Sequence, residues 1–241
     1  MSFHQPLKGI RVIDFCTHGA GPAACKMLAD WGAEVIKVEP LEGEAGRYTS
    51  KVLGMRADEL DNPHAELINA NKKSLPLNLK HPEGKAVMDK LLASANVFVS
   101  NYRIRALDKL GIGWEEMHAK HPHIIWAVLT GFGLYGPAAN NAGFDTVAFW
   151  ARSGAMIDFS ENGELPLTPP FALGDFTTAC SLAAGIAAAR YQDRSGRAGS
   201  DLPVWTGTVG KFRCVPGCES RQSLAQVPQT PRQPATQYLP L

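Results

Sequence analysis

The sequence predicts an α/β fold with a Rossmann-like, mainly parallel sheet and flanking helices. Two observations carry this prediction. Short apolar runs with the length of buried strands alternate with longer segments that have the start and stop signals of helices. Glycine and proline fall between these segments, where loops belong. With 241 residues, of which 45% are hydrophobic, the chain is long enough to bury a sizeable core.

The first elements form a strand–helix–strand unit. We predict a strand at residues 10–15, a loop at 16–22, a helix at 23–31 that ends at Gly32, and a second strand at 34–38. A unit of this length places its two strands parallel, with a right-handed crossover.

The alternation continues to about residue 190. Residues 51–71 are polar, lack a clean period and are predicted to be irregular or weakly helical. The pattern then predicts strands at 74–79, 96–100 and 124–130, and helices at 83–95, 105–110, 114–120, 145–157 and 177–189. Pro76 marks the first of these strands as a sheet edge, Pro82 falls in the first turn of a helix, and Gly111 ends another.

The character of the sequence changes near residue 198. Residues 200–241 are rich in proline and glutamine, poor in acids, and without a sustained apolar period. We therefore predict a division into an α/β region at 1–197 and an irregular, disordered tail at 198–241.

Charge and cysteine content exclude several classes of function. A net charge of +1 gives no reason to expect nucleic acid as a partner. Five cysteines at irregular spacing argue against a disulfide framework, and Cys214 and Cys218 have no nearby histidine to complete a metal site. Residues 1–7 lack the apolar core of a signal peptide, and no run has the length of a membrane span. We expect a cytoplasmic protein without a metal and without a membrane partner.

Asp175 stands where the last predicted helix begins, after a proline-rich approach at 166–170. One interpretation is an N-cap, in which the carboxylate accepts the free N–H groups of the first turn. The other is a nucleophile at the mouth of a cleft, kept ionised by the helix dipole and by those donors. Cys16, Cys25 and Cys180 have no evident base partner, so a nucleophile in this chain would be a carboxylate. The residues alone leave both interpretations open.

The loop after the first strand loosely fits a dinucleotide-binding fingerprint. Gly19, Gly21 and Ala24 follow the pattern, and Glu39 stands where a ribose-binding acid would be. Pro22 counts against this interpretation, because it removes a backbone N–H from the turn that would face a pyrophosphate. The glycines still favour the close approach of some ligand to this loop.

Basic residues gather in loops beside predicted strand ends, where anionic ligands bind in parallel sheets. They are Lys72, Lys73 and Lys80 in one region, and Arg103, Arg105 and Lys109 in another. Tyr102 lies among the second group, where its ring could stack on a base. This combination favours a phosphorylated ligand that carries adenine, although such charges are often only solvated. His18 is interpreted as an ordinary polar loop residue.

Several motifs, taken in order, resemble those of the family III CoA-transferases (the CaiB/BaiF type). They are LKGIRVIDF at 7–15, AGP at 20–22, LADWGAEVIKVE at 28–39, ANKKSLPLNLKHPEGK at 70–85, NYRIRALDKLG at 101–111, TGFGLYGP at 130–137, GFDTVAFWARSG at 143–154 and GDF at 174–176. The resemblance extends from residue 7 to about residue 196. It implies an enzyme that moves coenzyme A from an acyl-CoA donor to a free carboxylic acid.

The resemblance also implies a set of site residues. Asp175 matches the nucleophilic aspartate of the family. The positions that match its CoA contacts are Gly19, Ala20, Leu77, Asn78, Leu79, Lys80, Asn101, Tyr102, Arg103, Lys109, Ala142, Gly143 and Phe144. Pro40 replaces an arginine that the family often carries, which removes one expected phosphate contact. Coenzyme A is implied as a substrate, with no permanently bound cofactor, in an interlocked homodimer.

The motif wording is most similar to the branch that acts on 2-hydroxy acids, such as phenyllactate or 2-hydroxyisocaproate. A racemase of 2-methylacyl-CoA is the main enzymatic alternative, although Phe144 stands where such an enzyme would need a basic histidine. An inactive CoA-binding fragment is the other. Because the resemblance stops before the elements that complete the family's large domain, we expect the 241-residue chain to expose apolar surface, to associate and to transfer little CoA.

Overall fold

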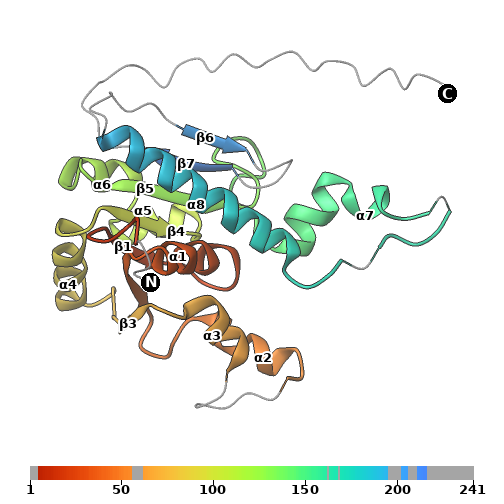
Figure 1. The fold of residues 1–241 in the computed structure, drawn as a ribbon, viewed down its shortest axis with the longest axis horizontal. Helices are drawn as coiled ribbons and strands as arrows, with labels where there is room; N and C mark the ends of the chain where they lie inside the picture. The colour runs from red at the N-terminus through yellow and green to blue at the C-terminus, as the bar shows by residue number, and fades with distance from the viewer. Residues whose placement is uncertain are drawn as a thin grey trace.

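The structure is a computed structural model that describes residues 5–55, 62–161, 163–167, 169–194, 202–205 and 211–215. Its centre is a sheet in the order β3-β2-β1-β4-β5-β7-β6 (Figure 1). The first five strands in the chain are β1 (Arg11–Phe15), β2 (Glu34–Glu39), β3 (Lys73–Pro76), β4 (Val97–Ser100) and β5 (Ile125–Thr130). These five strands pair with one another in parallel, which confirms the predicted α/β fold with a mainly parallel sheet.

The order of the parallel strands determines where a ligand can approach. β1 pairs with β2 on one side and β4 on the other, so that Ile13 lies between Ile36 and Phe98. The chain therefore winds outward in one direction from β1 to β3 and in the other from β4 to β5. In sheets of this kind, ligands bind beyond the carboxyl ends of the strands where the winding reverses. Here that point lies between β1 and β4.

The helices are α1 (Ala20–Asp30), η1 (Ala45–Tyr48), α2 (Thr49–Val52), α3 (Pro63–Asn69), α4 (Pro82–Ala93), α5 (Ile104–Leu110), α6 (Trp114–Lys120), α7 (Ala155–Asp158) and α8 (Leu173–Arg194). α1, α4, α5, α6 and α8 lie close to their predicted positions, whereas η1 and α2 were not predicted as helices and α3 lies in the stretch predicted to be irregular or weakly helical. Pro82 is in the first turn of α4, and Gly111 ends α5 with a left-handed φ of 77°, as the sequence predicts. Within the described segments, no helix has both the length and the apolarity that crossing a membrane requires.

The sheet separates two hydrophobic clusters. Because side chains alternate along a strand, Val12 points to one face and Ile13 to the other. α1 and α8 cover the first face, where the small side chains of α8 allow the two helices to pack closely (Figure 1). α4, α5 and α6 supply the cluster on the second face, including the fully buried Leu92. Each fully buried large apolar side chain stabilises the fold by about 1.5–3 kcal/mol.

The predicted helix at 145–157 is not continuous. Residues Asp145–Ala151 form a π-helical segment, η2, and α7 follows only after Gly154, which has φ of 88°. That left-handed conformation ends a helix, and glycine adopts it without steric cost. The break corrects the sequence prediction. It also leaves Asp145 at the start of η2, close to the start of α8.

Two further strands fall within the predicted irregular tail. β6 (Leu202–Trp205) and β7 (Lys211–Val215) pair with each other, and β7 pairs antiparallel with β5. The open edge of β5 offers backbone donors and acceptors with which another strand can pair. β6 and β7 can therefore form although each is too short to show an alternating pattern of apolar residues in the sequence. The other tail residues lie outside the described ranges, and the boundary between residues 197 and 198 stays a prediction.

Large apolar side chains are exposed in the segment that leads to α8. Ile157 is 70% exposed, Phe159 is 72% exposed and Leu165 is 87% exposed. Figure 1 shows α7 and its neighbouring loops lying away from the sheet. Phe171, just before α8, is also exposed. This surface has the character expected of a region that another polypeptide segment covers.

Candidate functional site

A cavity of about 290 Å³ lies beyond the carboxyl ends of β1, β4 and β5. It is lined by Thr17, His18, Gly19 and Ala20 after β1, by Asn101, Tyr102 and Arg103 after β4, and by Leu129, Thr130 and Gly131 at the end of β5. Residues between 139 and 149 and the first turns of α8 complete the wall. The cavity is therefore at the point where the winding of the sheet reverses.

Asp175 lines this cavity as the third residue of α8. The helix begins at Leu173, so Asp175 is inside its first turn, and the N-cap interpretation of Asp175 is wrong. The capping contact comes from another segment, because the backbone N–H of Asp175 donates to Oδ1 of Asp145 over 3.1 Å. Asp145 thus holds the start of α8, which leaves the side chain of Asp175 available to face the cavity.

The carboxylate of Asp175 lies directly against Gly19. A Cβ atom added to Gly19 would be 2.2 Å from Oδ2 of Asp175, far inside van der Waals contact. Gly19 is the N-terminal boundary residue of α1, and as glycine it has no side chain that could cap that helix. The first backbone N–H groups of α1 are therefore open on the side where the carboxylate lies. Only glycine leaves room for this arrangement.

The electrostatic environment of Asp175 differs from the sequence expectation. Burial and the neighbouring charge of Asp145 raise the pKa of Asp175 from 3.8 to about 6. Burial also raises the pKa of Asp145. The helix N-terminus favours ionisation, as predicted, but burial and a second carboxylate outweigh it. At pH 7 roughly 90% of Asp175 remains ionised, because its pKa still lies below the ambient pH.

A reciprocal pair of hydrogen bonds joins the loops after β1 and β4. The backbone N–H of Thr17 donates to Oδ1 of Asn101 over 2.9 Å, and Nδ2 of Asn101 donates to the carbonyl of Thr17 over 2.7 Å. The amide of Asn101 is therefore used within the protein. These bonds fix the wall of the cavity, and the predicted contact of Asn101 with CoA stays a prediction.

The structure brings together most of the predicted site residues. Nine of them line the cavity: Gly19, Ala20, Asn101, Tyr102, Arg103, Ala142, Gly143, Phe144 and Asp175. Leu77, Asn78, Leu79 and Lys80 instead follow β3, and Lys109 is near the end of α5. Lys80 and Lys109 are exposed. Any contact they make with a ligand would involve a part that extends beyond the cavity.

The aromatic and basic residues near the cavity have distinct roles. Tyr102 stacks on Phe15 with ring centroids 4.7 Å apart, so one face of its ring is already covered. Arg103 is exposed at the cavity wall. The prediction that Lys72 faces a ligand is wrong. Its Nζ lies 2.7 Å from Oδ2 of Asp14, and its side chain is almost fully buried. Lys73 forms an ion pair with Glu34.

Glu39 is not available to bind a ribose. Its carboxylate accepts hydrogen bonds from Arg47, Ser74 and the backbone N–H of Glu44. Burial raises its pKa, but these hydrogen bonds outweigh burial and bring the pKa to about 2. The dinucleotide interpretation therefore loses its acid as well as the N–H that Pro22 removes.

The family model of CoA-transferase family III matches residues 7–205. The chain belongs to CoA-transferase family III. It is 39% identical to the (R)-2-hydroxy-4-methylpentanoate CoA-transferase of Clostridioides difficile over 186 residues, which are 77% of this chain and 47% of that protein. It is 38% identical to the cinnamoyl-CoA:phenyllactate CoA-transferase of Clostridium sporogenes over 196 residues, 81% of this chain and 48% of that protein. These matches confirm the family resemblance.

A solved structure supports the same assignment. A CAIB/BAIF family protein from Brucella suis has 30% sequence identity and a TM-score of 0.73, covering 80% of this chain and 51% of that chain. This family III chain thus spans about half the length of the curated relatives it matches.

Sequence reasoning missed several residues of this family III site, and three of them bear on its chemistry. Thr17, His18 and Asp145 all line the cavity. His18 has a left-handed φ of 59°, which is uncommon for a residue other than glycine, and its ring meets Phe144 edge to face at 5.6 Å. The GFD motif contained the signal for Asp145, but nothing in the sequence indicates that a residue thirty positions away caps α8.

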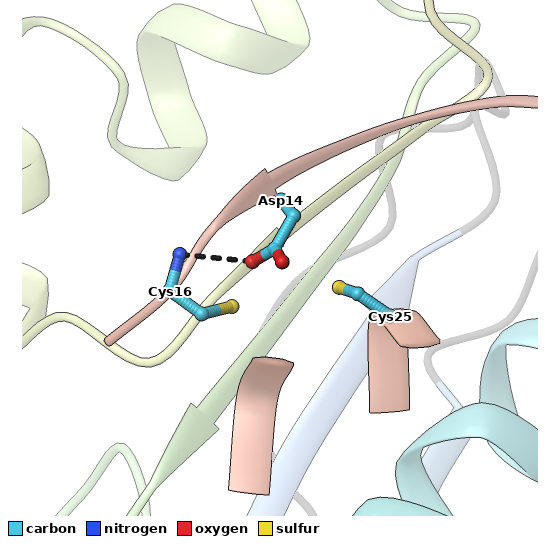
Figure 2. Close-up of side chains that lie close together, drawn as sticks. All are labelled: Asp14, Cys16 and Cys25. Carbon is cyan, nitrogen blue, oxygen red and sulfur yellow. Dashed lines mark hydrogen bonds between the residues drawn. The ribbon is translucent and has the colours of Figure 1, made fainter. Parts of the chain in front are cut away.

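Three buried side chains, Asp14, Cys16 and Cys25, are of the types that bind metal ions and lie close together. Figure 2 shows Asp14 on β1, Cys16 just after it, and Cys25 on α1. The ligand atoms of these three side chains all lie within 4.8 Å of one another. However, the ammonium of Lys72 already neutralises Asp14, and Sγ of Cys16 donates to the carbonyl of Val99. Burial raises the pKa of the Cys16 thiol well above its usual range, which disfavours the thiolate that a metal needs. We interpret the cluster as part of the core.

Proposed function

We propose that this chain carries the nucleophilic half-site of a CoA-transferase, with Asp175 as the residue that becomes acylated. The observation that supports the proposal best is the placement of Asp175: a half-buried carboxylate in a cavity at the switch point, against Gly19 at the open N-terminus of α1. A carboxylate in that position can attack a carbonyl, and backbone N–H groups next to it can stabilise the oxyanion that forms.

The chemistry balances through two kinds of acyl intermediate. The Asp175 carboxylate attacks the thioester carbonyl of the donor and releases CoA thiolate, which leaves a mixed anhydride. The thiolate then attacks the aspartyl carbonyl and releases the donor acid, which leaves an aspartyl–CoA thioester. The acceptor carboxylate and the thiolate repeat these two steps in reverse order, which regenerates Asp175. A carboxylate nucleophile conserves the thioester's energy through the anhydride, whereas serine would form a stable ester.

We further propose that the acceptor is a small 2-hydroxy acid. The similarity to transferases of 2-hydroxy-4-methylpentanoate and phenyllactate supports this class. The cavity also fits it, because Thr17 and His18 can bind a hydroxyl or carboxylate while Phe144 and Phe149 provide apolar surface for the side chain. The formyl-CoA:oxalate CoA-transferase of Escherichia coli is 35% identical, so other acids remain within the family's range.

Trapping should identify Asp175 directly. We expect the protein, incubated with 2-hydroxy-4-methylpentanoyl-CoA and hydroxylamine, to carry a hydroxamate on the peptide that contains Asp175, as measured by mass spectrometry. Borohydride should reduce the same residue. Asp175→Ala is expected to abolish both modifications. Modification of another residue, or transfer activity that survives Asp175→Ala, would show that the nucleophile has been misassigned.

Three basic residues should contribute to binding of the CoA phosphates. Lys80→Ala, Arg103→Ala and Lys109→Ala are each expected to weaken CoA about fivefold or more, because each removes a charge-assisted contact of about 1 kcal/mol. The losses should shrink at high salt. Lys90→Ala, in the last turn of α4, is the matched control. Equal CoA affinity in all variants, measured by titration calorimetry, would reduce the three residues to ordinary surface charges, and tighter binding of NAD than of CoA would favour a dinucleotide site.

A second candidate function is transfer of an α-proton, because the structure places a histidine in the cavity. Phe144 supplies no base, but His18 lies beside it and lines the same cavity as Asp175. A histidine and a carboxylate are the two bases that racemisation at the α-carbon needs. Incubating a 2-methylacyl-CoA together with an acceptor carboxylic acid in D₂O distinguishes the two activities. CoA transfer without deuterium at the α-carbon supports the transferase, whereas deuterium incorporation without transfer supports the racemase.

The partner that completes the site is proposed to be further polypeptide of the same protein in a homodimer. The exposed Ile157, Phe159 and Leu165 support this proposal, since such residues are usually covered.

A further inference from the structure

The backbone beside the proposed nucleophile is held in an unfavourable conformation. His18, directly before Gly19, has φ of 59°. A left-handed conformation costs a residue with a Cβ about 1–2 kcal/mol, so surrounding contacts must maintain it. Because Gly19 touches Asp175, any relaxation of His18 would move the backbone that faces the carboxylate.

The carboxylate of Glu44 supplies those contacts from below the loop. Its Oε2 accepts a hydrogen bond from Oγ1 of Thr17 over 2.7 Å and from the backbone N–H of His18 over 3.1 Å. The same oxygen accepts the backbone N–H of Gly46 over 2.5 Å, which fixes the position of Glu44 itself. The side chain of Glu44 is only 1% exposed, so these contacts form away from solvent, where they are strong.

Lys37 provides the opposite charge and a third contact with the loop. Its Nζ lies 3.7 Å from Oε1 of Glu44, and both side chains are 1% exposed. The same ammonium donates to the carbonyl of Cys16 over 3.1 Å. The Lys37–Glu44 pair therefore holds three consecutive residues of the cavity loop, 16–18, against β2 and the segment that follows it.

We propose that Glu44 is a positioning residue for acylation of Asp175. The inference rests on the proposed function of Asp175. Glu44 does not line the cavity, so it would not touch the acyl-CoA. It acts through Thr17 and His18, by keeping Gly19 and the open N-terminus of α1 against the reacting carboxylate. Misplacement of groups around a reacting centre by about 1 Å is enough to cost roughly 100-fold in rate.

This role predicts a separation between binding and reaction. Loss of the Glu44 contacts should lower the rate at which Asp175 is acylated and leave the affinity for CoA nearly unchanged. A residue that only stabilises the fold would instead reduce the fraction of folded protein, with the same acylation rate for each folded molecule. The two roles therefore give different single-turnover results.

The test separates the effect of side-chain length at position 44 from the effect of its charge. Glu44→Asp keeps the charge opposite Lys37 but shortens the side chain by one methylene, so it should lose the bonds to Thr17 and His18. The double variant Lys37→Met with Glu44→Gln removes both charges and keeps the carbonyl oxygen at its original reach. We expect Glu44→Asp to acylate Asp175 at least tenfold more slowly. The double variant loses the bond from Lys37 to the Cys16 carbonyl but keeps an oxygen in reach of Thr17 and His18, so we expect its acylation to be slowed less than that of Glu44→Asp. Leu92→Ala, a core truncation in α4 away from the cavity, is the control for destabilisation.

The measurement is single-turnover formation of the Asp175 hydroxamate from 2-hydroxy-4-methylpentanoyl-CoA, corrected for folded fraction by circular dichroism, with the dissociation constant of CoA measured in parallel. Acylation of Glu44→Asp at the natural rate overturns the inference, as does a double variant slower than Glu44→Asp. If Glu44→Asp does not fold, the double variant alone decides, since acylation more than tenfold slower in the folded double variant contradicts positioning by reach. If the natural protein gives no hydroxamate, the proposed function of Asp175 fails instead. The dissociation constant of CoA then shows whether the protein still binds CoA but does not react, or does not bind it at all.

Discussion

Asp175→Asn is expected to abolish the aspartyl–CoA intermediate and, at pH 7, to increase the free energy of unfolding by about 1–2 kcal/mol. The gain follows from the environment of the carboxylate. Burial and the nearby Asp145 raise the pKa of Asp175 from 3.8 to about 6. That rise corresponds to about 3 kcal/mol by which the ionised side chain destabilises the folded state at neutral pH. Asparagine removes this cost, although it also loses about 1 kcal/mol of favourable interaction with the helix N-terminus.

The pH dependence provides the check on this explanation. A group whose pKa is raised by folding stabilises the protein below its unfolded pKa, and that contribution is lost as the pH rises through the folded value. The stability of the natural protein relative to Asp175→Asn should therefore be highest below pH 3.8 and should fall as the pH rises through about 6. Denaturant unfolding between pH 3.5 and pH 8 measures this difference in stability. Glu115→Gln, which changes an exposed carboxylate in the first turn of α6, is the control. A difference that does not vary with pH would contradict the electrostatic origin.

The parallel sheet could be predicted because its strands are buried on both faces. Runs such as residues 125–130 are then apolar throughout, and the loops between elements contain glycine and proline. Local signals also identified the ends of α4 and α5, where Pro82 and Gly111 act within one turn. β6 and β7 gave no such signal, because their pairing depends on the open edge of β5.

The site was predictable as a set of motifs but not as a set of contacts. Asp175 could be identified by its position in GDF, yet its pKa depends on burial and on Asp145, which no local pattern reveals. Lys72 and Glu39 were misread for the same reason. Lys72 forms a buried pair with Asp14, 58 positions away in the sequence, and Glu39 accepts bonds from Arg47 and from Ser74, which is 35 positions away. Whether a charge faces a ligand or another charge is decided by tertiary structure.

Position 19 should be sensitive to the addition of a single methyl group. Gly19→Ala is expected to lower the acylation rate of Asp175 at least 100-fold and to destabilise the fold by about 1–3 kcal/mol. The backbone at Gly19 has φ of −92°, which alanine adopts without strain, so the effect would be purely steric. The new Cβ would lie 2.2 Å from Oδ2 and 3.0 Å from Cγ of Asp175, and one of the two segments would have to move.

A double-mutant cycle with a matched control isolates that contact. Asp175→Ala leaves only its own Cβ near position 19, at 3.3 Å, so Gly19→Ala should cost little stability in that background. Gly113→Ala is the comparison, because its Cβ would meet Oδ1 of the exposed Asp108 side chain at 2.1 Å, which can rotate away, and the Cα of Asp108 at 3.3 Å, which needs only a small shift. Since Gly113 is also the N-cap of α6, we expect Gly113→Ala to cost up to about 1 kcal/mol of stability. If Gly19→Ala were as mild as Gly113→Ala, or equally costly with and without the Asp175 carboxylate, the close approach of α1 to the nucleophile would not be what shapes this site.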